Sequence, residues 1–328
     1  MKVLERRNIP PQQWDGVVLG SPEGFLFALS GWQEIIPPVK RWDLRDHGFG
    51  ILQRGALAAV VPLHQRPDGA LASSGWGWSG PVMRGDLSAV ERREVMAAAM
   101  AELPQRARRL EARDLSLGMP AMTDSSIHAP QGVNPFFLFG WKDTSRYTRV
   151  IDFTGQDEES LWQGLAPDAR RIIRHCREAG FQVAQVPWPE HVDSYYAIHE
   201  ETYTRTGVPP HPRAYFEGIA RLSTQGPYSR LYAGCDPEGQ VVAYHNVAVL
   251  NGLSLYHTGC SRTLHLNSGI NYLLLWEAIR QAHLAGDRRY EVGIVDPSET
   301  DGKIAGLTRF KSKFGGILCR SFFASLRL

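Results

Sequence analysis

The residues best suited to polar chemistry lie in the stretch GLTRFKSKFGG at positions 306–316. Lys311 and Lys313 stand two residues apart there, in a chain with only six lysines among 36 basic residues. The compact ammonium group of lysine can bind a phosphate or stabilise a developing oxyanion. The two side chains would share a face on a strand and diverge on a helix. A solvated surface position is the alternative for each lysine.

A basic stripe is the second candidate, in the segment APDARRIIRHCREAG. Arg170, Arg174 and Arg177 are spaced i, i+4 and i+7, so a helix would carry them on one face, with Arg171 to one side. Such a stripe could contact the phosphates of RNA or of a nucleotide sugar. A solvated helix face is the alternative.

Candidate acid–base residues are few, and no Ser-His-Asp or Cys-His arrangement is evident. His245 and His257 lie on predicted strands and could act as bases, or could be half-buried structural residues. Asp296 and Glu299, in VDPSETDG, could help to deprotonate an amine, or could belong to a plain loop.

In the first half of the chain, the elements that must position these residues alternate between strands and helices. Residues 49–65 are predicted to form a β-hairpin around the turn QRG. The Gly/Trp-rich segment 73–86 is incompatible with a regular helix. Residues 88–113 have a helical pattern that we expect to break at Pro104, and residues 114–120 are typical of a short buried strand.

The second half is predicted to contain a strand, two helices, a strand, a helix, three strands, a helix and a strand. These elements are assigned, in order, to residues 147–153, 157–180, 181–186, 191–207, 230–261, 267–286 and 289–294. A helix, a meander, a helix and a strand in this order are typical of a GNAT acyltransferase core. We therefore predict an α/β protein with mixed sheets, built of two tandem GNAT-like domains with a groove between them. The first is residues 1–146, which 317–328 could rejoin, and the second is residues 147–316.

The predicted helix that begins near Asn267 is a third candidate site. GNAT acetyltransferases bind the pyrophosphate of coenzyme A on a glycine-rich loop at such a helix N-terminus, where unpaired N–H groups favour anions. Here only Gly269 is present, and Asn271 and Tyr272 stand where a second small residue would be needed. We therefore expect that acetyl-CoA binding has been lost and that the protein uses no cofactor. A purely structural helix cap is the alternative.

The bulk composition is that of an ordinary globular protein. The chain has 328 residues, 43% of them hydrophobic, and a net charge of +2, which points to no class of partner. Its four cysteines form no CxxC pair, so no metal site is expected. The sequence shows no signal peptide and no stretch that could span a membrane, so we expect a cytoplasmic protein.

Several of these stretches together resemble the Fem family, the non-ribosomal aminoacyltransferases that use aminoacyl-tRNA to extend peptidoglycan side chains. The resemblance rests on the segments ARRIIRHCREAG and YYAIHEETYTRTG, on the block from LYHTGCS to RRYEVG, and above all on GLTRFKSKFGG. The last matches a family motif with Gly-Leu or Gly-Ile, then Phe-Lys, then Phe-Gly-Gly. No helical-hairpin arm is visible, so the resemblance is to the FemX-like branch.

The resemblance implies roles for particular residues. Phe310 and Lys311 are similar to the Phe-Lys pair that supports the tRNA 3′ end and the transition state. Lys40, or Arg41 beside it, and Arg205 resemble groups that hold the phosphates of the precursor, and Tyr256 could line the same groove.

The main hypothesis is therefore an aminoacyltransferase that moves an amino acid from aminoacyl-tRNA to an amine of a peptidoglycan precursor. The acceptor would be UDP-MurNAc-pentapeptide or a lipid-linked precursor, which could place the protein at the inner membrane face. The surface expected to meet tRNA comprises Arg170, Arg171, Arg174, Arg177 and Lys313. The alternatives are an acyl-CoA-dependent GNAT enzyme acting on a small amine or metabolite, and a non-catalytic protein that binds nucleotide sugars or RNA.

Overall fold

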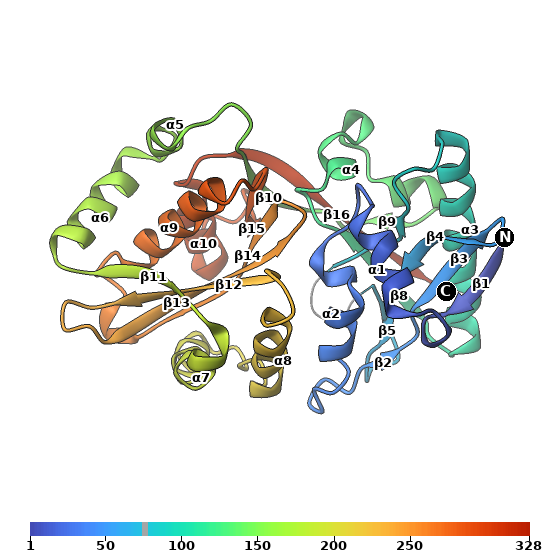
Figure 1. Ribbon diagram of the computed structural model, residues 1–328, viewed down its shortest axis with the longest axis horizontal. Coiled ribbons are helices and arrows are strands. Elements are labelled where there is room, and N and C mark those ends of the chain that lie inside the picture. The colour runs from blue at the N-terminus through green and yellow to red at the C-terminus, as the bar shows by residue number, and fades with distance from the viewer. Residues whose placement is uncertain (74–77) are drawn as a thin grey trace. The chain divides into compact units, whose positions relative to one another are not determined.

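The computed structural model describes residues 1–73 and 78–328 (Figure 1). Residues 74–77, part of the predicted Gly/Trp-rich segment, lie outside the described residues. The chain forms two compact units. Unit 1 is Met1–Arg146 together with Cys319–Leu328, and unit 2 is Tyr147–Leu318.

Unit 1 combines strands of two sheets with one long helix. One sheet has the order β1-β3-β4-β7, made of Lys2–Glu5, Phe49–Gln53, Ala56–Val61 and Val82–Met83. The other strands are β2 (Arg45–Asp46), β5 (His64–Gln65), β6 (Leu71–Ala72), β8 (Asp114–Met119), β9 (Lys142–Asp143) and β16 (Ile317–Arg327). The α-helices are α1 (Pro11–Leu19), α2 (Ser30–Ile35), α3 (Ala89–Arg109) and α4 (Asp124–Ile127).

The predicted hairpin at residues 49–65 is confirmed, but the predicted break at Pro104 is wrong. The hairpin turns at Arg54 and Gly55, which both have positive φ angles, of 51° and 83°. Helix α3 begins with a capping box at Ser88 and continues through Pro104 to Arg109. Proline in a helix interior costs about 3 kcal/mol. Tertiary packing outweighs this cost here, because the neighbouring Leu103 is fully buried in the core of unit 1.

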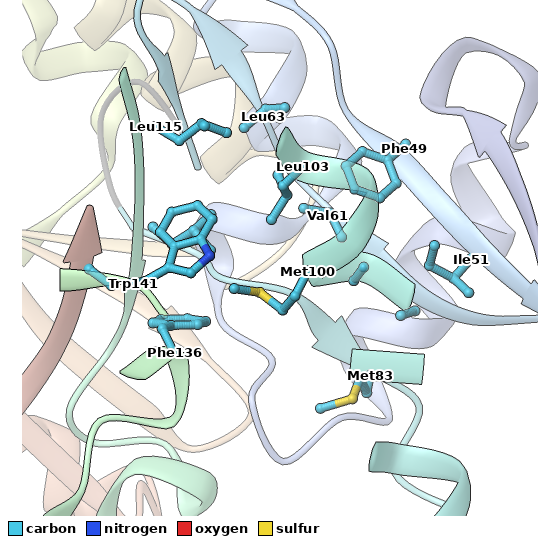
Figure 2. Close-up of a cluster of buried hydrophobic side chains, with 14 of the residues drawn as sticks. Phe49, Ile51, Val61, Leu63, Met83, Met100, Leu103, Leu115, Phe136 and Trp141 are labelled. Atoms are coloured by element: carbon cyan, nitrogen blue, oxygen red, sulfur yellow. The ribbon is translucent and has the colours of Figure 1, made fainter. Parts of the chain in front are cut away.

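The core of unit 1 lies between α3 and the strands that pack on it (Figure 2). Met100 and Leu103 of α3 lie among the same buried side chains as Phe49 and Val61 of the hairpin. Trp141, which immediately precedes β9, closes this cluster and is only 2% exposed.

Unit 2 contains the predicted order of helix, meander, helix and strand. Its sheet has the strand order β11-β12-β13-β14-β15-β10. These strands are Gln182–Val186, Ser229–Cys235, Val241–Leu250, Leu253–Ser261, Arg289–Val295 and Arg146–Asp152. The helices are α5 (Glu158–Gln163), α6 (Pro167–Glu178), α7 (Trp188–Thr206), α8 (Arg213–Ser223), α9 (Ile270–Leu284) and α10 (Gly302–Ser312). Helix α8 was not predicted from the sequence.

The helices of unit 2 cover both faces of its sheet (Figure 1). Helices α6 and α9 lie on one side, and α7 and α8 lie on the other. On the α9 side, Leu274, Trp276 and Ile279 of the helix are fully buried in one cluster with Tyr290 and Val292 of β15. No helix among the described residues combines the length and the apolar character that a membrane span requires.

Candidate functional site

The two lysines of GLTRFKSKFGG diverge, because residues 302–312 form a helix. Lys311 lies on α10, and Lys313 is its C-terminal cap. The Lys311 amine turns toward β15, where Nζ donates a hydrogen bond to the Ile294 carbonyl oxygen at 2.9 Å. The Lys313 amine turns toward α6 and forms an ion pair with Asp168 at 2.6 Å. The two ammonium groups therefore lie in different environments, one at the sheet and one at helix α6.

The Lys311 amine lies where two parallel strands separate. The pairing of β14 with β15 ends at Leu255 and Glu291, and the bond from Lys311 to Ile294 comes three residues further along β15. Gly293 makes room for the amine, because a Cβ atom there would lie 3.0 Å from Lys311 Nζ. The backbone at Gly293 also has a φ of +81°, which other residues rarely adopt.

Burial and a buried carboxylate act in opposite directions on Lys311. Burial lowers the pKa of Lys311 to about 8, while the charge of Glu291, whose side chain is wholly buried, raises it. The Tyr256 ring adds a cation–π contact, with Nζ 5.6 Å from the ring centroid. The ammonium form still predominates at pH 7, so the strand opening holds a charged hydrogen-bond donor.

The two histidines of the meander each lie within hydrogen-bond distance of a tyrosine hydroxyl; His245 is buried and His257 is partly buried. His245 Nε2 lies 2.7 Å from the Tyr290 hydroxyl, and its ring lies 4.1 Å from that of Tyr256. His257 Nε2 lies 2.9 Å from the Tyr215 hydroxyl. Burial lowers the pKa of each histidine to about 3, so both are neutral at pH 7 and are weak bases. These contacts support the structural interpretation of both residues.

Phe310, the partner of Lys311 in the motif, belongs to an aromatic cluster at the end of α10. Its ring lies 4.9 Å from Tyr272 of α9 in an edge-to-face arrangement, and 5.3 Å from Phe314. The Tyr272 ring also faces Lys313, whose Nζ lies 5.6 Å from its centroid. Tyr272 stands near the position where a coenzyme A loop would have its second small residue. Here its ring packs against the C-terminal end of the GLTRFKSKFGG motif.

A cavity of about 440 Å³ lies between α6 and the N-terminal end of α9. Arg171, Arg174, His175 and Glu178 line it from α6, and Asn267, Ser268 and Gly269 line it from the segment that leads into α9. Gly269 has a φ of +85° and caps the helix. The cavity thus combines two guanidinium groups and a helix N-terminus with one carboxylate, that of Glu178, and the balance of charge favours an anion.

The other two arginines of the α6 stripe have partners within unit 2. Arg170 Nη1 donates to the backbone and side-chain oxygens of Gln163, at 2.8 Å each. Arg177 Nη2 forms an ion pair with Glu277 of α9 at 2.5 Å. The sequence spacing groups Arg170 and Arg177 with Arg174, whereas the structure pairs Arg174 with Arg171 at the cavity.

The residues predicted to hold the precursor are divided between the two units. Lys40 and Arg41 are exposed on a turn of unit 1 after α2. Arg205 belongs to unit 2, where its Nη1 donates to Thr263 Oγ1 at 2.7 Å and so fixes the segment after β14. Tyr256 is half-buried beside Lys311.

The predicted acidic residues show a local structural role. The Asp296 carboxylate accepts hydrogen bonds from the Ser298 backbone N–H at 3.0 Å and from its hydroxyl at 2.6 Å, which lowers the pKa of Asp296. Glu299 is exposed in the same loop.

Sequence reasoning missed two residues that shape the surroundings of Lys311, namely Glu291 and Gly293. A signal for both is present in the strand RYEVGIV. A carboxylate in the middle of a mostly apolar strand is costly to bury, and a glycine in a strand interior often marks a close approach by another group.

Comparisons with known proteins agree with this architecture. Residues 167–312, from α6 to the end of α10, match a family model described as an acetyltransferase (GNAT) domain. The crystal structure of FemX is similar over 100% of this chain and 98% of its own, with 15% identity and a TM-score of 0.74. No curated protein matches the sequence.

Two further structures are similar over nearly the whole chain, with lower TM-scores. One is the C-terminal domain of a putative lysylphosphatidylglycerol synthetase from Agrobacterium fabrum, with 12% identity, a TM-score of 0.63, and coverage of 96% of this chain and 90% of that one. The other is a tandem GNAT protein from the clavulanic acid biosynthesis pathway, with 13% identity, a TM-score of 0.56, and coverage of 99% and 98%.

The protein therefore has the tandem GNAT-like fold, and the mixed α/β class predicted from the sequence is confirmed. The resemblance to the Fem family is confirmed at the level of the fold, because FemX matches over the whole chain. This fold supports an acyl-transfer enzyme.

Proposed function

We propose that the protein transfers an amino acid from an aminoacyl-tRNA to an amine of a peptidoglycan precursor, UDP-MurNAc-pentapeptide or its lipid-linked form. The observation that carries this proposal is the Lys311 ammonium, held at 2.9 Å from the Ile294 carbonyl oxygen where β14 and β15 separate. The fold shared with FemX and with a putative lysylphosphatidylglycerol synthetase supports an aminoacyl group as the cargo.

The transfer requires no covalent catalysis by the protein, because an aminoacyl ester is already activated. The acceptor amine attacks the ester carbonyl carbon, a C–N bond forms, and the C–O bond to the ribose breaks. The proton lost by the amine goes to the departing ribose oxygen. The protein must align the two substrates and stabilise the negative charge on the carbonyl oxygen, and Lys311 supplies a charged donor for that oxygen.

The tRNA is proposed to bind through two features of unit 2. Arg171 and Arg174, with the N-terminus of α9, provide a cavity that suits a backbone phosphate near the acceptor end. Phe310 provides an aromatic ring beside Lys311 for a terminal base. The guanidinium groups of Arg170 and Arg177 and the Lys313 amine add positive charge around them, although each has a partner within the protein.

The precursor is proposed to bind the residues that the Fem resemblance indicates. In this proposal, Lys40 or Arg41 and Arg205 bind its phosphates, and Tyr256 lies along the acceptor peptide near Lys311.

A transfer assay tests the proposal. The assay follows a radiolabelled aminoacyl group from charged tRNA to UDP-MurNAc-pentapeptide, with wild-type protein and with Arg171→Ala/Arg174→Ala. We expect the KM for aminoacyl-tRNA to rise about tenfold or more in the double variant. Arg93→Ala/Arg108→Ala, which removes two exposed arginines from α3, is the matched control and should leave the KM unchanged. If wild-type protein transfers no label from any charged tRNA, the proposed reaction is wrong.

A second candidate function is acyl-CoA-dependent transfer to a small amine. The match of residues 167–312 to a GNAT acetyltransferase domain favours it, as does the cavity at the N-terminus of α9. Calorimetric titration with acetyl-CoA distinguishes the two functions. Micromolar binding that is lost in Arg171→Ala/Arg174→Ala would favour coenzyme A, whereas aminoacyl transfer without such binding favours the tRNA reaction.

A further inference from the structure

An exposed apolar tip projects from unit 1 at the 3₁₀-helix η4 (Pro135–Phe139). Three consecutive side chains form it: Phe137, Leu138 and Phe139 are 61%, 77% and 38% exposed. Large apolar side chains gathered in one short turn are uncommon on soluble surfaces and mark interaction sites.

The base of this tip is held firmly. Phe136 and Trp141, on either side of the tip, are buried in the core of unit 1 (Figure 2). Between the core and the tip lies Asn134, 1% exposed, whose Nδ2 donates to the Phe323 carbonyl oxygen at 2.8 Å and to Asp143 Oδ1 at 3.0 Å. Asn134 Oδ1 accepts from the Phe136 N–H at 3.0 Å. The sequence NPFFLFGW therefore builds a fixed turn that presents its apolar residues outward.

The chain segments that adjoin the tip carry positive charge. Lys142 and Arg146 are exposed just after it in the chain, and Arg320 on β16 donates to the Gly132 carbonyl oxygen just before it. The nearest carboxylate in this segment, Asp143, is neutralised by Arg320 at 2.5 Å. Three cations against one anion favour a negatively charged partner.

The size and shape of the tip argue for a bilayer and against a second copy of this chain. Its three side chains expose roughly 300 Å² in all, taking about 150–250 Å² for a fully exposed aromatic side chain. A stable dimer buries about 800 Å² per partner. In an interfacial membrane contact, phenylalanine and leucine side chains enter the boundary between headgroups and acyl chains. Lysine and arginine side chains beside them contact the anionic headgroups.

We propose that the Phe137–Phe139 tip, with Lys142 and Arg146, docks the protein on an anionic lipid surface. This inference concerns a different part of the chain from the transfer site and does not rest on the proposed reaction.

Co-sedimentation with large unilamellar vesicles tests it, with phosphatidylcholine alone and with phosphatidylcholine containing phosphatidylglycerol. We expect the wild-type protein to bind the mixed vesicles, and to bind them less at high salt. Phe137→Ser/Leu138→Ser should reduce the partition coefficient about tenfold or more, and Lys142→Glu should reduce binding to the mixed vesicles alone. The control Val90→Ser/Leu284→Ser removes two apolar side chains that are 54% and 57% exposed elsewhere and should bind as wild type does.

Two outcomes would overturn the membrane proposal. The first is that wild-type protein does not sediment with either kind of vesicle, or that the wild-type protein and the tip variant sediment with the vesicles to the same extent. The second is a tip variant that changes only the oligomeric state in light scattering, which would assign the tip to contacts between copies. Circular dichroism verifies that each variant is folded, and Lys142→Glu provides an independent test if the serine variant is not.

Discussion

Replacing Lys311 with methionine separates its chemical role from its structural role. Methionine keeps most of the length and apolar volume of the lysine side chain and removes its charge and its donor. The residue lies in the opening between β14 and β15, so the substitution leaves the parallel pairs Leu253–Arg289 to Leu255–Glu291 intact.

The structure gives the size of both effects. The fall in the Lys311 pKa from 10.5 to about 8 corresponds to about 3 kcal/mol of unfavourable charge burial, at about 1.36 kcal/mol per pH unit. Methionine removes that cost, but the Ile294 carbonyl oxygen loses its donor, which costs about 1–3 kcal/mol. The free energy of unfolding should therefore change by less than about 2 kcal/mol. Loss of one preorganised donor to an oxyanion costs about 2.7–4 kcal/mol, or about 100- to 1,000-fold in rate.

Two measurements on Lys311→Met examine this reasoning. Urea unfolding gives the free energy of unfolding, and single-turnover transfer from charged tRNA gives the rate of the chemical step. A variant that is as stable as wild type but transfers within threefold of its rate would refute the role of Lys311 in the transition state. A variant that is destabilised by far more than about 2 kcal/mol would show that the amine is mainly structural.

The other predictions concern the same opening. The proposed transfer needs the ammonium form of Lys311, whereas the guanidinium group of Lys311→Arg does not titrate in this range. In a pH–rate profile, the ratio of the wild-type rate to the Lys311→Arg rate should therefore fall as pH rises through about 8. A constant ratio would contradict this prediction. Because the folded-state pKa of Lys311 is depressed, its buried charge destabilises the fold below about pH 8. As pH rises from about 8 to 10.5, the wild-type free energy of unfolding should increase relative to that of Lys311→Met by up to about 3 kcal/mol, as measured by urea titration. Equal pH dependence of the two proteins would argue against burial of the charge. Gly293→Ala should slow transfer about tenfold or more by displacing the amine, whereas Gly239→Ala, with a similar φ of +82° and open space around it, should cost only the backbone strain of about 1–2 kcal/mol. Equal transfer rates in the two alanine variants would show that Gly293 does not position Lys311.

Local patterns in the sequence were enough to predict most of unit 2. The split between α5 and α6 follows from Pro167, and Gly180, with a φ of +88°, ends the second helix as expected. The three-stranded meander follows from apolar runs separated by turn residues. Such features are encoded within a few residues of one another.

Other features depend on contacts between distant segments, which a single sequence does not display. Two lysines two residues apart fit a strand or a helix, and only the structure shows that Lys311 reaches Ile294 while Lys313 reaches Asp168. Helical spacing groups Arg174 with Arg170 and Arg177, but the partners of those two lie on other segments, at Gln163 and Glu277. The cavity pair of Arg171 and Arg174 is defined by the position of α9, and not by α6 alone.

Gly269 has a consequence for how the arginine-lined cavity recognises ligands. A Cβ atom at this position would lie 2.8 Å from Ile172 Cγ2 and 3.3 Å from Cys176 Cβ, so helix α6 rests directly on the first turn of α9. The two walls of the cavity meet at this contact and share one rigid support. Its aperture should therefore keep a fixed width, and it should select anions by their dimensions, with no closure of one helix onto the other when a ligand arrives.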